Sequence, residues 1–271
     1  MNKIISTCFL LLSLASFSQK AKVFKSLNEA LTNPTAVVFL DLKAQSLTSL
    51  PDVISQLTNL EKIELSNNSF AAFPRQLLTL PKLKIIFLNS NAITTLPAEI
   101  AQMKMLVNLR LDANPFLEPN AELKKCAAIP NLMVLNFSAN RVSAFIPELL
   151  GMKNLAELDL GYGTIKTLPA DIERMKALKR LVLAKNAITT LPPTFFKLEQ
   201  LENLDISYNG FTTLQPDFVK LPYLEVLDVS YNKTLATMPA CKHIRYINIT
   251  KTKLNFEKLK WDLGEYATIL M

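Results

Sequence analysis

Apolar and polar positions recur along this chain in one short pattern. In residues 178–192, LKRLVLAKNAITTLP, leucine or isoleucine stands at the first, fourth, sixth, eleventh and fourteenth positions, and Asn186 stands at the ninth. The alternation around Leu181 and Leu183 has the period of two that is typical of a half-buried strand. Asn186 is expected at the following turn, where its amide can bond backbone groups that no strand or helix satisfies.

The pattern occurs ten times over residues 37–254. Successive first positions are 23 residues apart, except for a step of 26 after the fourth and of 20 after the ninth; they are Val37, Leu60, Leu83, Leu106, Leu132, Leu155, Leu178, Leu201, Leu224 and Ile244. Such self-similarity indicates a solenoid, in which each unit buries its apolar side against its neighbours. We therefore predict one short strand per repeat in a parallel sheet, with short turns or single helical turns behind it. Only residues 120–128, in the longest repeat, have room for a true helix.

Asparagine fills the ninth position of seven repeats, as Asn68, Asn91, Asn114, Asn140, Asn186, Asn209 and Asn232. The column is interrupted at Gln45, Gly163 and Thr252. The first and last lie in terminal repeats, which are commonly atypical. Gly163 lies in the middle and contributes no side-chain hydrogen bond, so we predict a local weak point there, with functional bending of the stack as the alternative.

The ends of the solenoid need covers, because an open repeat would expose the core to water. Residues 19–36 are predicted to form an N-terminal capping helix, since Ser26 and Glu29 have the spacing of a capping box. Residues 255–271 are predicted to close the other end, with Phe256, Leu259 and Leu263 on one face of a helix.

Residues 1–18 have the features of a secretory signal peptide. Lys3 supplies the positive charge, the middle is rich in leucine, and Ser16 and Ser18 are small residues suited to a cleavage site. The alternative, a membrane anchor, needs roughly 20 apolar residues, whereas residues 4–17 provide 14. We predict a secreted, periplasmic or envelope protein without a transmembrane segment after cleavage.

Charge and cysteine content narrow the range of partners only slightly. The chain has 30 basic and 23 acidic residues, a net charge of +7, and loss of Lys3 with the signal peptide would leave 29 − 23 = +6. This modest excess, concentrated between Lys242 and Lys260, permits an anionic partner or surface but does not indicate specific nucleic-acid binding.

Cys126 and Cys241 lie in repeats four and nine, about 24 Å apart by strand spacing, so we predict that they stay unpaired.

The repeats carry a family resemblance. Residues 83–97, LKIIFLNSNAITTLP, resemble the 23-residue bacterial leucine-rich repeats and the similar Ras-group repeats, and SLNEALTNP resembles the N-terminal segment of secreted bacterial members. The resemblance implies an α/β fold: a leucine-rich-repeat solenoid, curved as a right-handed horseshoe with a parallel concave sheet and helical caps. It also implies protein binding, but members of the family bind different partners, so the fold alone does not identify one.

The sequence offers no constellation for catalysis or metal binding. His243 is the only histidine, and with Cys241 it would supply two ligands where a zinc site needs three or four. A Gly-rich phosphate loop, G-x-S-x-G and H-E-x-x-H are all missing. We predict neither enzyme activity nor a cofactor.

Outward-facing residues of the C-terminal repeats form the candidate binding surface. Exposed tyrosine and arginine are typical anchors of protein interfaces. The candidates are Asp159, Tyr162, Arg180, Lys185, Asp205, Tyr208, Asp228, Tyr231 and Tyr246. The N-terminal half provides only Phe39, Phe87 and Arg110, which look scattered in the sequence.

Three interpretations of this surface remain open. The first is a surface that binds a protein partner, the second is a surface that binds an envelope glycan stacked on the tyrosines, and the third is a structural solenoid without a dedicated ligand. We expect a monomer that binds a protein, and the partner itself is not identified by the sequence.

Overall fold

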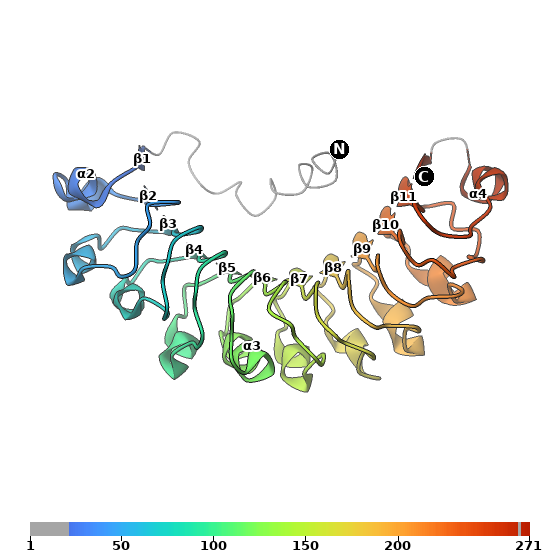
Figure 1. Ribbon diagram of the computed structural model, residues 1–271, viewed down its shortest axis with the longest axis horizontal. Helices are drawn as coiled ribbons and strands as arrows, with labels where there is room; N and C mark the ends of the chain where they lie inside the picture. Colours follow the sequence, from blue (N-terminus) through green and yellow to red (C-terminus); the bar gives the residue numbers. More distant parts are fainter. Residues whose placement is uncertain (1–21, 265–266) are drawn as a thin grey trace.

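The chain is described by a computed structural model over residues 22–264 and 267–271, and the predicted signal peptide lies outside this range. The described residues form an arc, with strands along its inner side and helical turns along its outer side (Figure 1). All strands are parallel and belong to one open sheet in which each is hydrogen-bonded to the strand before it in sequence. The prediction of a solenoid with a parallel concave sheet is confirmed.

Each repeat contributes one strand of three residues. The sheet begins with β1 (Val23–Phe24), which precedes the repeats, and ends with β12 (Thr268–Leu270), which follows them. The strands of the repeats are β2 (Phe39–Asp41), β3 (Lys62–Glu64), β4 (Ile85–Phe87), β5 (Asn108–Arg110), β6 (Val134–Asn136), β7 (Glu157–Asp159), β8 (Arg180–Val182), β9 (Asn203–Asp205), β10 (Val226–Asp228) and β11 (Tyr246–Asn248).

The outer side consists mainly of 3-10 turns, as expected where a repeat has few residues to spare. These turns are η1 (Pro34–Ala36), η2 (Asp52–Gln56), η3 (Arg75–Thr79), η4 (Ala98–Gln102), η5 (Pro147–Gly151), η6 (Ile172–Arg174), η7 (Pro193–Lys197) and η8 (Pro216–Lys220). The longer repeat forms the α-helix α3 (Pro119–Ala127), which confirms the prediction for this segment. Buried Glu122 on α3 accepts the N–H of Leu96 at 2.7 Å and pairs with Lys125 at 2.9 Å, so the helix is bonded to the preceding repeat.

The core is a continuous column of aliphatic side chains between the two sides. The middle residue of each strand aligns with that of the next, for example Leu181 with Leu204, and both are buried. Ile172 in the outer turns is fully buried against the same column. Because burying a leucine-sized side chain contributes about 1.5–3 kcal/mol, packing between repeats is the main source of stability.

The asparagine column links each repeat to its predecessor. The amide nitrogen of Asn186 donates to the carbonyl oxygens of Leu160 at 3.1 Å and Leu183 at 3.0 Å, while its oxygen accepts the N–H of Ile165 at 2.9 Å. Asn209 makes the equivalent bonds one repeat later. The predicted role of these asparagines in the turn is confirmed.

Gly163 fits its position for a steric reason that the sequence did not reveal. A Cβ atom on this residue would overlap the carbonyl oxygen of Val142 and lie 2.7 Å from the side-chain oxygen of Asn186. The N–H of Gly163 is bonded to the carbonyl of Lys185 at 3.1 Å. The glycine therefore permits close packing of repeats five to seven, a steric role that the predicted weak point did not include.

Both ends of the solenoid carry a helix and an added strand. Helix α2 (Leu27–Leu31) begins at Ser26, whose hydroxyl accepts the N–H of Glu29 at 3.1 Å. The Glu29 carboxylate accepts the N–H of Lys25 rather than that of Ser26, so the box is displaced by one residue. Strand β1 lies within residues 19–36, for which a helix was predicted, so that prediction was wrong for Val23 and Phe24 and the α-helix covers only Leu27–Leu31.

At the C-terminal end, α4 (Phe256–Leu263) is capped by Asn255, whose side-chain oxygen accepts the N–H of Lys258 at 2.9 Å. Leu259 and Leu263 are buried, as predicted, and Trp261 is 85% exposed. Residues 268–270 then return to the sheet as β12, parallel to β11, which the sequence pattern does not indicate. Within residues 22–264 and 267–271, the helices are all too short or too polar to span a bilayer.

Candidate binding surface

The residue before the ninth position, which is asparagine in seven repeats, has a left-handed backbone in every repeat. Its φ is +60° at Tyr162, +53° at Lys185 and Tyr208, and +58° at Tyr231. The full row consists of Ala44, Asn67, Ser90, Ala113, Ala139, Tyr162, Lys185, Tyr208, Tyr231 and Lys251. A non-glycine residue in this conformation costs about 1–2 kcal/mol, and bulky side chains are uncommon there.

The row lies beside the strands and not on them. Tyr208 follows the end of β9 at Asp205 by three residues, and Tyr162 follows the end of β7 in the same way. The tyrosines are thus on the edge of the concave sheet where the chain leaves it. This position is more lateral than the outward-facing strand positions of Asp159, Arg180 and Asp205. The row is small in the first five repeats and consists of tyrosine or lysine in the last five.

Four members of this row contact one another and form what we call the tyrosine ladder: Tyr162, Lys185, Tyr208 and Tyr231. The rings of Tyr208 and Tyr231 are stacked, with centroids 4.0 Å apart and planes 8° apart. The ammonium of Lys185 lies 4.4 Å from the centroid of Tyr162 and 5.0 Å from that of Tyr208. These are the distances of cation–π contacts, so the four side chains hold each other in place.

The ladder remains accessible to solvent. Tyr162 is 54% and Tyr208 is 41% exposed, and Lys185 is also exposed. The neighbouring Tyr231 hydroxyl raises the pKa of the Tyr208 hydroxyl above its ordinary value. Tyrosine is neutral at physiological pH even without such a shift, so both hydroxyls can donate and accept hydrogen bonds. An ordered, uncharged aromatic surface with one cation in it is suited to contact with another macromolecule.

The aspartates of the candidate set have a structural role in the turns. Each accepts, at 2.9 Å, the N–H of the residue two positions further on: Asp159 from Gly161, Asp205 from Ser207 and Asp228 from Ser230. Burial raises the pKa of Asp159 and of Asp205 to about 6. Their carboxylates are held beside the ladder, but stabilisation of the turn is a sufficient reason for their presence.

The remaining candidates are spread over the sheet. Arg180 lies half-buried on β8, and Tyr246 on β11 is 52% exposed outside the ladder. Val182 and Ala184 alternate with the buried Leu181 and Leu183 and so face away from the core, yet each is only 8% exposed. Facing away from the core does not mean exposure to solvent here, because parallel strands about 4.8 Å apart crowd their side chains on the inner surface of an arc.

The N-terminal half also contains a cluster, contrary to the expectation of scattered residues. The ammonium of Lys62 lies 4.1 Å from the ring of Phe39 and 5.1 Å from that of Phe87, and the guanidinium of Arg110 lies 4.8 Å from the Phe87 ring. Burial lowers the pKa of Lys62. Lys62 is thus packed between aromatic rings and is not an inert surface position.

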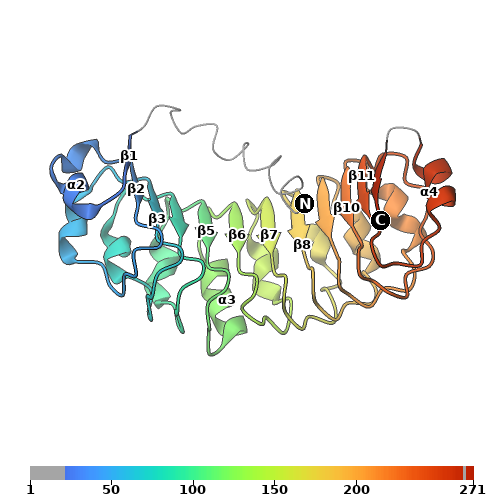
Figure 2. The same ribbon diagram turned by 45° about the horizontal axis from the view of Figure 1, so that its top comes forward.

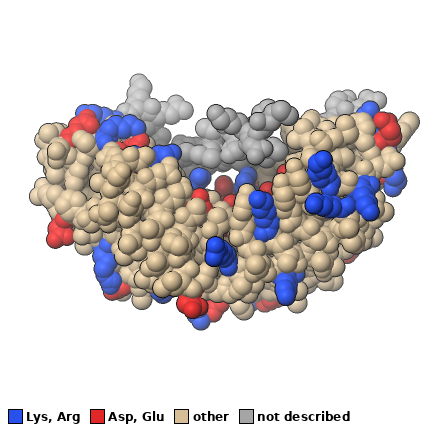
Figure 3. Space-filling model, viewed as in Figure 1, with Lys and Arg blue, Asp and Glu red and all other residues tan. Residues whose placement is uncertain are grey.

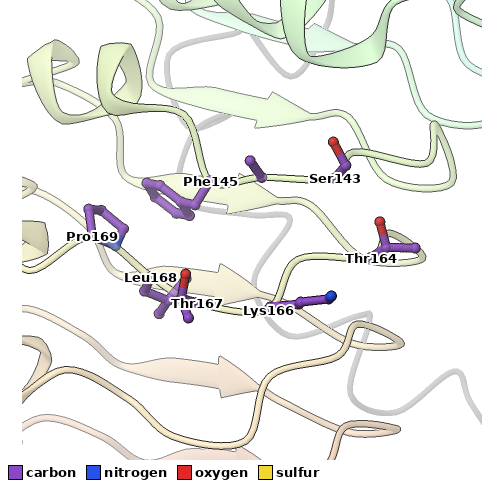
Figure 4. A pocket seen from close by; sticks show the side chains of 8 residues that line it. Ser143, Phe145, Thr164, Lys166, Thr167, Leu168 and Pro169 are labelled. Carbon is purple, nitrogen blue, oxygen red and sulfur yellow. The ribbon is translucent and has the colours of Figure 1, made fainter.

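A groove of about 670 Å³ lies between repeats five and six, away from the candidate residues. Figure 4 shows Phe145, Leu168 and Pro169 at one end and Ser143 and Thr164 at the other. Lys166 is its only ionisable lining residue. The groove therefore contains no acid–base pair with which to catalyse a reaction.

The described residues contain no group of three or more histidine, cysteine or acidic side chains that could hold a metal ion. Cys126 and Cys241 are buried and free, as predicted. Burial raises the pKa of the Cys241 thiol to about 11 and lowers that of His243. Neither group is in the protonation state of an activated thiolate–imidazolium pair.

Comparison with known proteins agrees with this architecture. A family model described as leucine rich repeat matches residues 58–116 and 176–234. A leucine-rich-repeat protein of Leptospira interrogans is similar in structure, with 23% identity and a TM-score of 0.51, over 92% of this chain and 100% of that one. No curated protein matches the chain.

A second similar structure is the leucine-rich-repeat ectodomain of the plant membrane receptor kinase GASSHO1/SCHENGEN3 from Arabidopsis thaliana, solved in complex with Casparian strip integrity factor 2. It shares 20% identity with a TM-score of 0.61, over 92% of this chain and 34% of the receptor chain. At this level of identity the likeness concerns the fold.

Proposed function

We propose that this chain, which folds as a leucine-rich-repeat solenoid and matches the leucine-rich-repeat family model in two regions, is an exported, monomeric binding module without catalytic activity. We also propose that the tyrosine ladder is its main contact with a protein partner. Parallel strands in such a solenoid create one extended surface on which contacts from several repeats combine. The solved receptor complex from Arabidopsis is an example of the same fold with a bound partner.

The observation that carries the proposal is the contact between the four ladder residues. Bulky side chains occupy a strained backbone position in consecutive repeats, where the N-terminal half has alanine, asparagine or serine. Their mutual stacking fixes the rotamers before a partner arrives, which reduces the entropy cost of binding. The left-handed backbone itself occurs in every repeat, so the bulky side chains, and not the strain, distinguish this surface.

The ring contacts favour a protein partner over a glycan. A sugar that stacks on tyrosine needs a free ring face. One face of Tyr208 is against Tyr231, and Lys185 of the preceding repeat lies over the ring from the other side. The ladder therefore offers ring edges, hydroxyl groups and a cation in its middle, with free faces only at its two ends.

Export is the second part of the proposal, supported by the order of charged, apolar and small residues in the first 18 positions. We expect cleavage near Ser18 and location in the periplasm, the envelope or the medium. Mass spectrometry of the protein purified from its native host tests this directly, and a mature protein that retains Met1 would contradict it.

Affinity capture from envelope and medium fractions, followed by titration of the captured protein, tests the proposed contact. Tyr208→Ala should weaken binding by about 2 kcal/mol or more, since it removes the central ring. Asn67→Ala is the matched control, because Asn67 has the same backbone conformation in the distant half, with φ of +56°. Equal losses for both variants would place the contact elsewhere.

The salt dependence of binding separates the alternatives. Binding that involves Lys185 and Arg180 should weaken as ionic strength rises, whereas stacking on a neutral sugar should not. If purified envelope glycans bind with an affinity that Tyr208→Ala abolishes and salt leaves unchanged, the glycan interpretation replaces the protein one.

A further inference from the structure

The C-terminal edge of the sheet is open. Among residues 22–264 and 267–271, strand β12 is the last in the strand order and is paired with β11 only. Thr268 and Leu270 are bonded to β11, since the N–H of Thr268 donates to Arg245 at 2.7 Å and the carbonyl of Leu270 accepts from Ile249 at 2.8 Å. Alternate residues of a parallel strand bond opposite neighbours, so the N–H and C=O of Ile269 point away from the sheet.

The two ends of the sheet differ in how they limit further pairing. Strand β1 has two residues and is flanked by charged groups: Lys22 lies over the Phe24 ring at 4.5 Å, and Lys25 pairs with Asp41. Short length and lysines are common ways of blocking an edge strand. β12, by contrast, contains no charge.

Large apolar side chains are exposed at the same end of the solenoid. Leu270 is 43%, Met271 is 73% and Trp261 is 85% exposed. Figures 1 and 2 both show α4, which carries Trp261, at the same end of the solenoid as the C-terminus. An unpaired strand edge next to exposed apolar groups is a ready template for an additional strand.

Charge around this edge indicates what could pair with it. Lys242 and Arg245 precede β11, and Lys251 and Lys253 follow it, so basic groups lie near both ends of the last strands. Among the described residues, Arg245 alone of these four has an ion pair, with Glu225 at 3.4 Å. In Figure 3, Lys and Arg side chains gather over the C-terminal repeats. A second copy would bring like charges together, whereas a segment with acidic ends would be attracted.

We propose that the edge of β12 accepts an extended segment of a partner protein as an additional strand, with apolar residues beside Leu270 and acidic residues at both ends. The main-chain groups of Ile269 would supply the hydrogen bonds, and the flanking lysines would select the sequence. This surface is separate from the tyrosine ladder and does not depend on its function.

Selection of random twelve-residue peptides on the purified chain tests the proposal without a known partner. The enriched peptides should combine a central β-branched or aliphatic stretch with Asp or Glu near both ends. Their affinity, measured by fluorescence anisotropy, should fall at least tenfold with Ile269→Pro, because the substitution removes the outward N–H and leaves the bonds of Thr268 and Leu270 to β11 in place.

Two further variants make the outcome decisive. Leu270→Lys adds a charge to the edge without changing the backbone, and its affinity for the peptides should also fall at least tenfold. This variant decides the test if Ile269→Pro lowers the melting temperature. The double variant Lys251→Glu, Lys253→Glu should lose peptide binding, whereas Tyr208→Ala should keep it. Peptides that bind all these variants equally would overturn the proposal, and so would a selection that enriches no acidic peptides. A dimer that is detected by light scattering and dissociated by Leu270→Lys would also overturn it, because the edge would then pair with a second copy.

Discussion

One asparagine side chain connects each repeat with the repeat before it. In Asn186, a single amide satisfies carbonyl groups of two repeats and one N–H, all of which belong to turns without a regular backbone partner. A buried polar group that loses its partner costs about 1–3 kcal/mol. The bonds of Asn186 are therefore short-range, but they hold two neighbouring repeats together.

Asn186→Ala should lower the free energy of unfolding by about 1–3 kcal/mol in denaturant melts. Val182→Ala is not a neutral comparison, because Val182 is only 8% exposed. Thr190→Ala, at an exposed position of the same repeat, should change stability by less than about 0.5 kcal/mol. Equal effects of the two substitutions would mean that the asparagine is not needed in the turn.

Gly163 leads to a prediction opposite to that from the repeat pattern, which favours asparagine at this position. Gly163→Asn should destabilise the protein by about 1–3 kcal/mol through overpacking, because a Cβ would meet Val142 and Asn186. Gly151→Ala is the control, since no atom lies within 4 Å of the added Cβ. A more stable Gly163→Asn variant would contradict the steric explanation.

Asp205 should make stability depend on pH. Its folded pKa of about 6 is above the ordinary value of 3.8, so the folded state holds its proton more tightly and stability falls as pH rises between these values. Asp205→Asn, which keeps an oxygen for the Ser207 N–H, should raise stability at pH 7 by about 3 kcal/mol and have no effect below pH 3.5. Denaturant melts across this pH range measure the difference in stability between the variant and the unchanged chain. A stabilisation by Asp205→Asn that does not change with pH would contradict the titration of Asp205.

At the scale of elements, the strands and turns of this protein are too short to be stable alone. A three-residue strand and a 3-10 turn gain their order from the repeats on either side. The terminal elements have a neighbour on one side only, so their own capping interactions matter more. Helix α2, with five residues, depends on the hydroxyl of Ser26.

Ser26→Ala should cost about 1 kcal/mol of stability, and native-state hydrogen exchange should locate the loss in β1, α2 and the first repeat. Ser26→Asn keeps a capping oxygen and should restore most of it. Loss of protection spread evenly over all repeats would show that the end does not open as a separate unit.

The alternation of apolar positions was sufficient to predict the strands of the repeats, because Leu181 and its equivalents are buried in every repeat. The three extra residues near Cys126 predicted α3. Strands β1 and β12 were missed, since two or three residues show no periodicity and are defined only by pairing with β2 and β11. The burial of Val182 was missed because it arises from curvature and neighbouring strands.

For the candidate surface, the sequence placed Tyr208 and Tyr231 in one column but did not reveal the left-handed backbone or the stacking between the rings. The position directly before an asparagine in a turn was the available signal. The cluster around Lys62 was missed because Phe39 and Lys62 are the first residues of their strands, whereas Phe87 is the last residue of its strand. These different strand positions come together only when the strands lie side by side.

At the scale of the whole molecule, the solenoid keeps its parts independent. Each repeat contacts its neighbours, so the tyrosine ladder of repeats six to nine and the open edge of β12 can act separately. The same independence means that a change in the ladder should not disturb the distant core. The ladder residues are partly or fully exposed, which allows binding and stability to be measured as separate quantities.

The most direct test of the account is the triple variant in which Tyr162, Tyr208 and Tyr231 are alanine, compared with the unchanged chain in a titration of the captured partner. We expect binding to weaken by at least about 2 kcal/mol while the melting temperature stays nearly the same, because alanine occupies the same backbone position at Ala113 and Ala139. Unchanged affinity in the triple variant would contradict the assignment of the contact to the ladder.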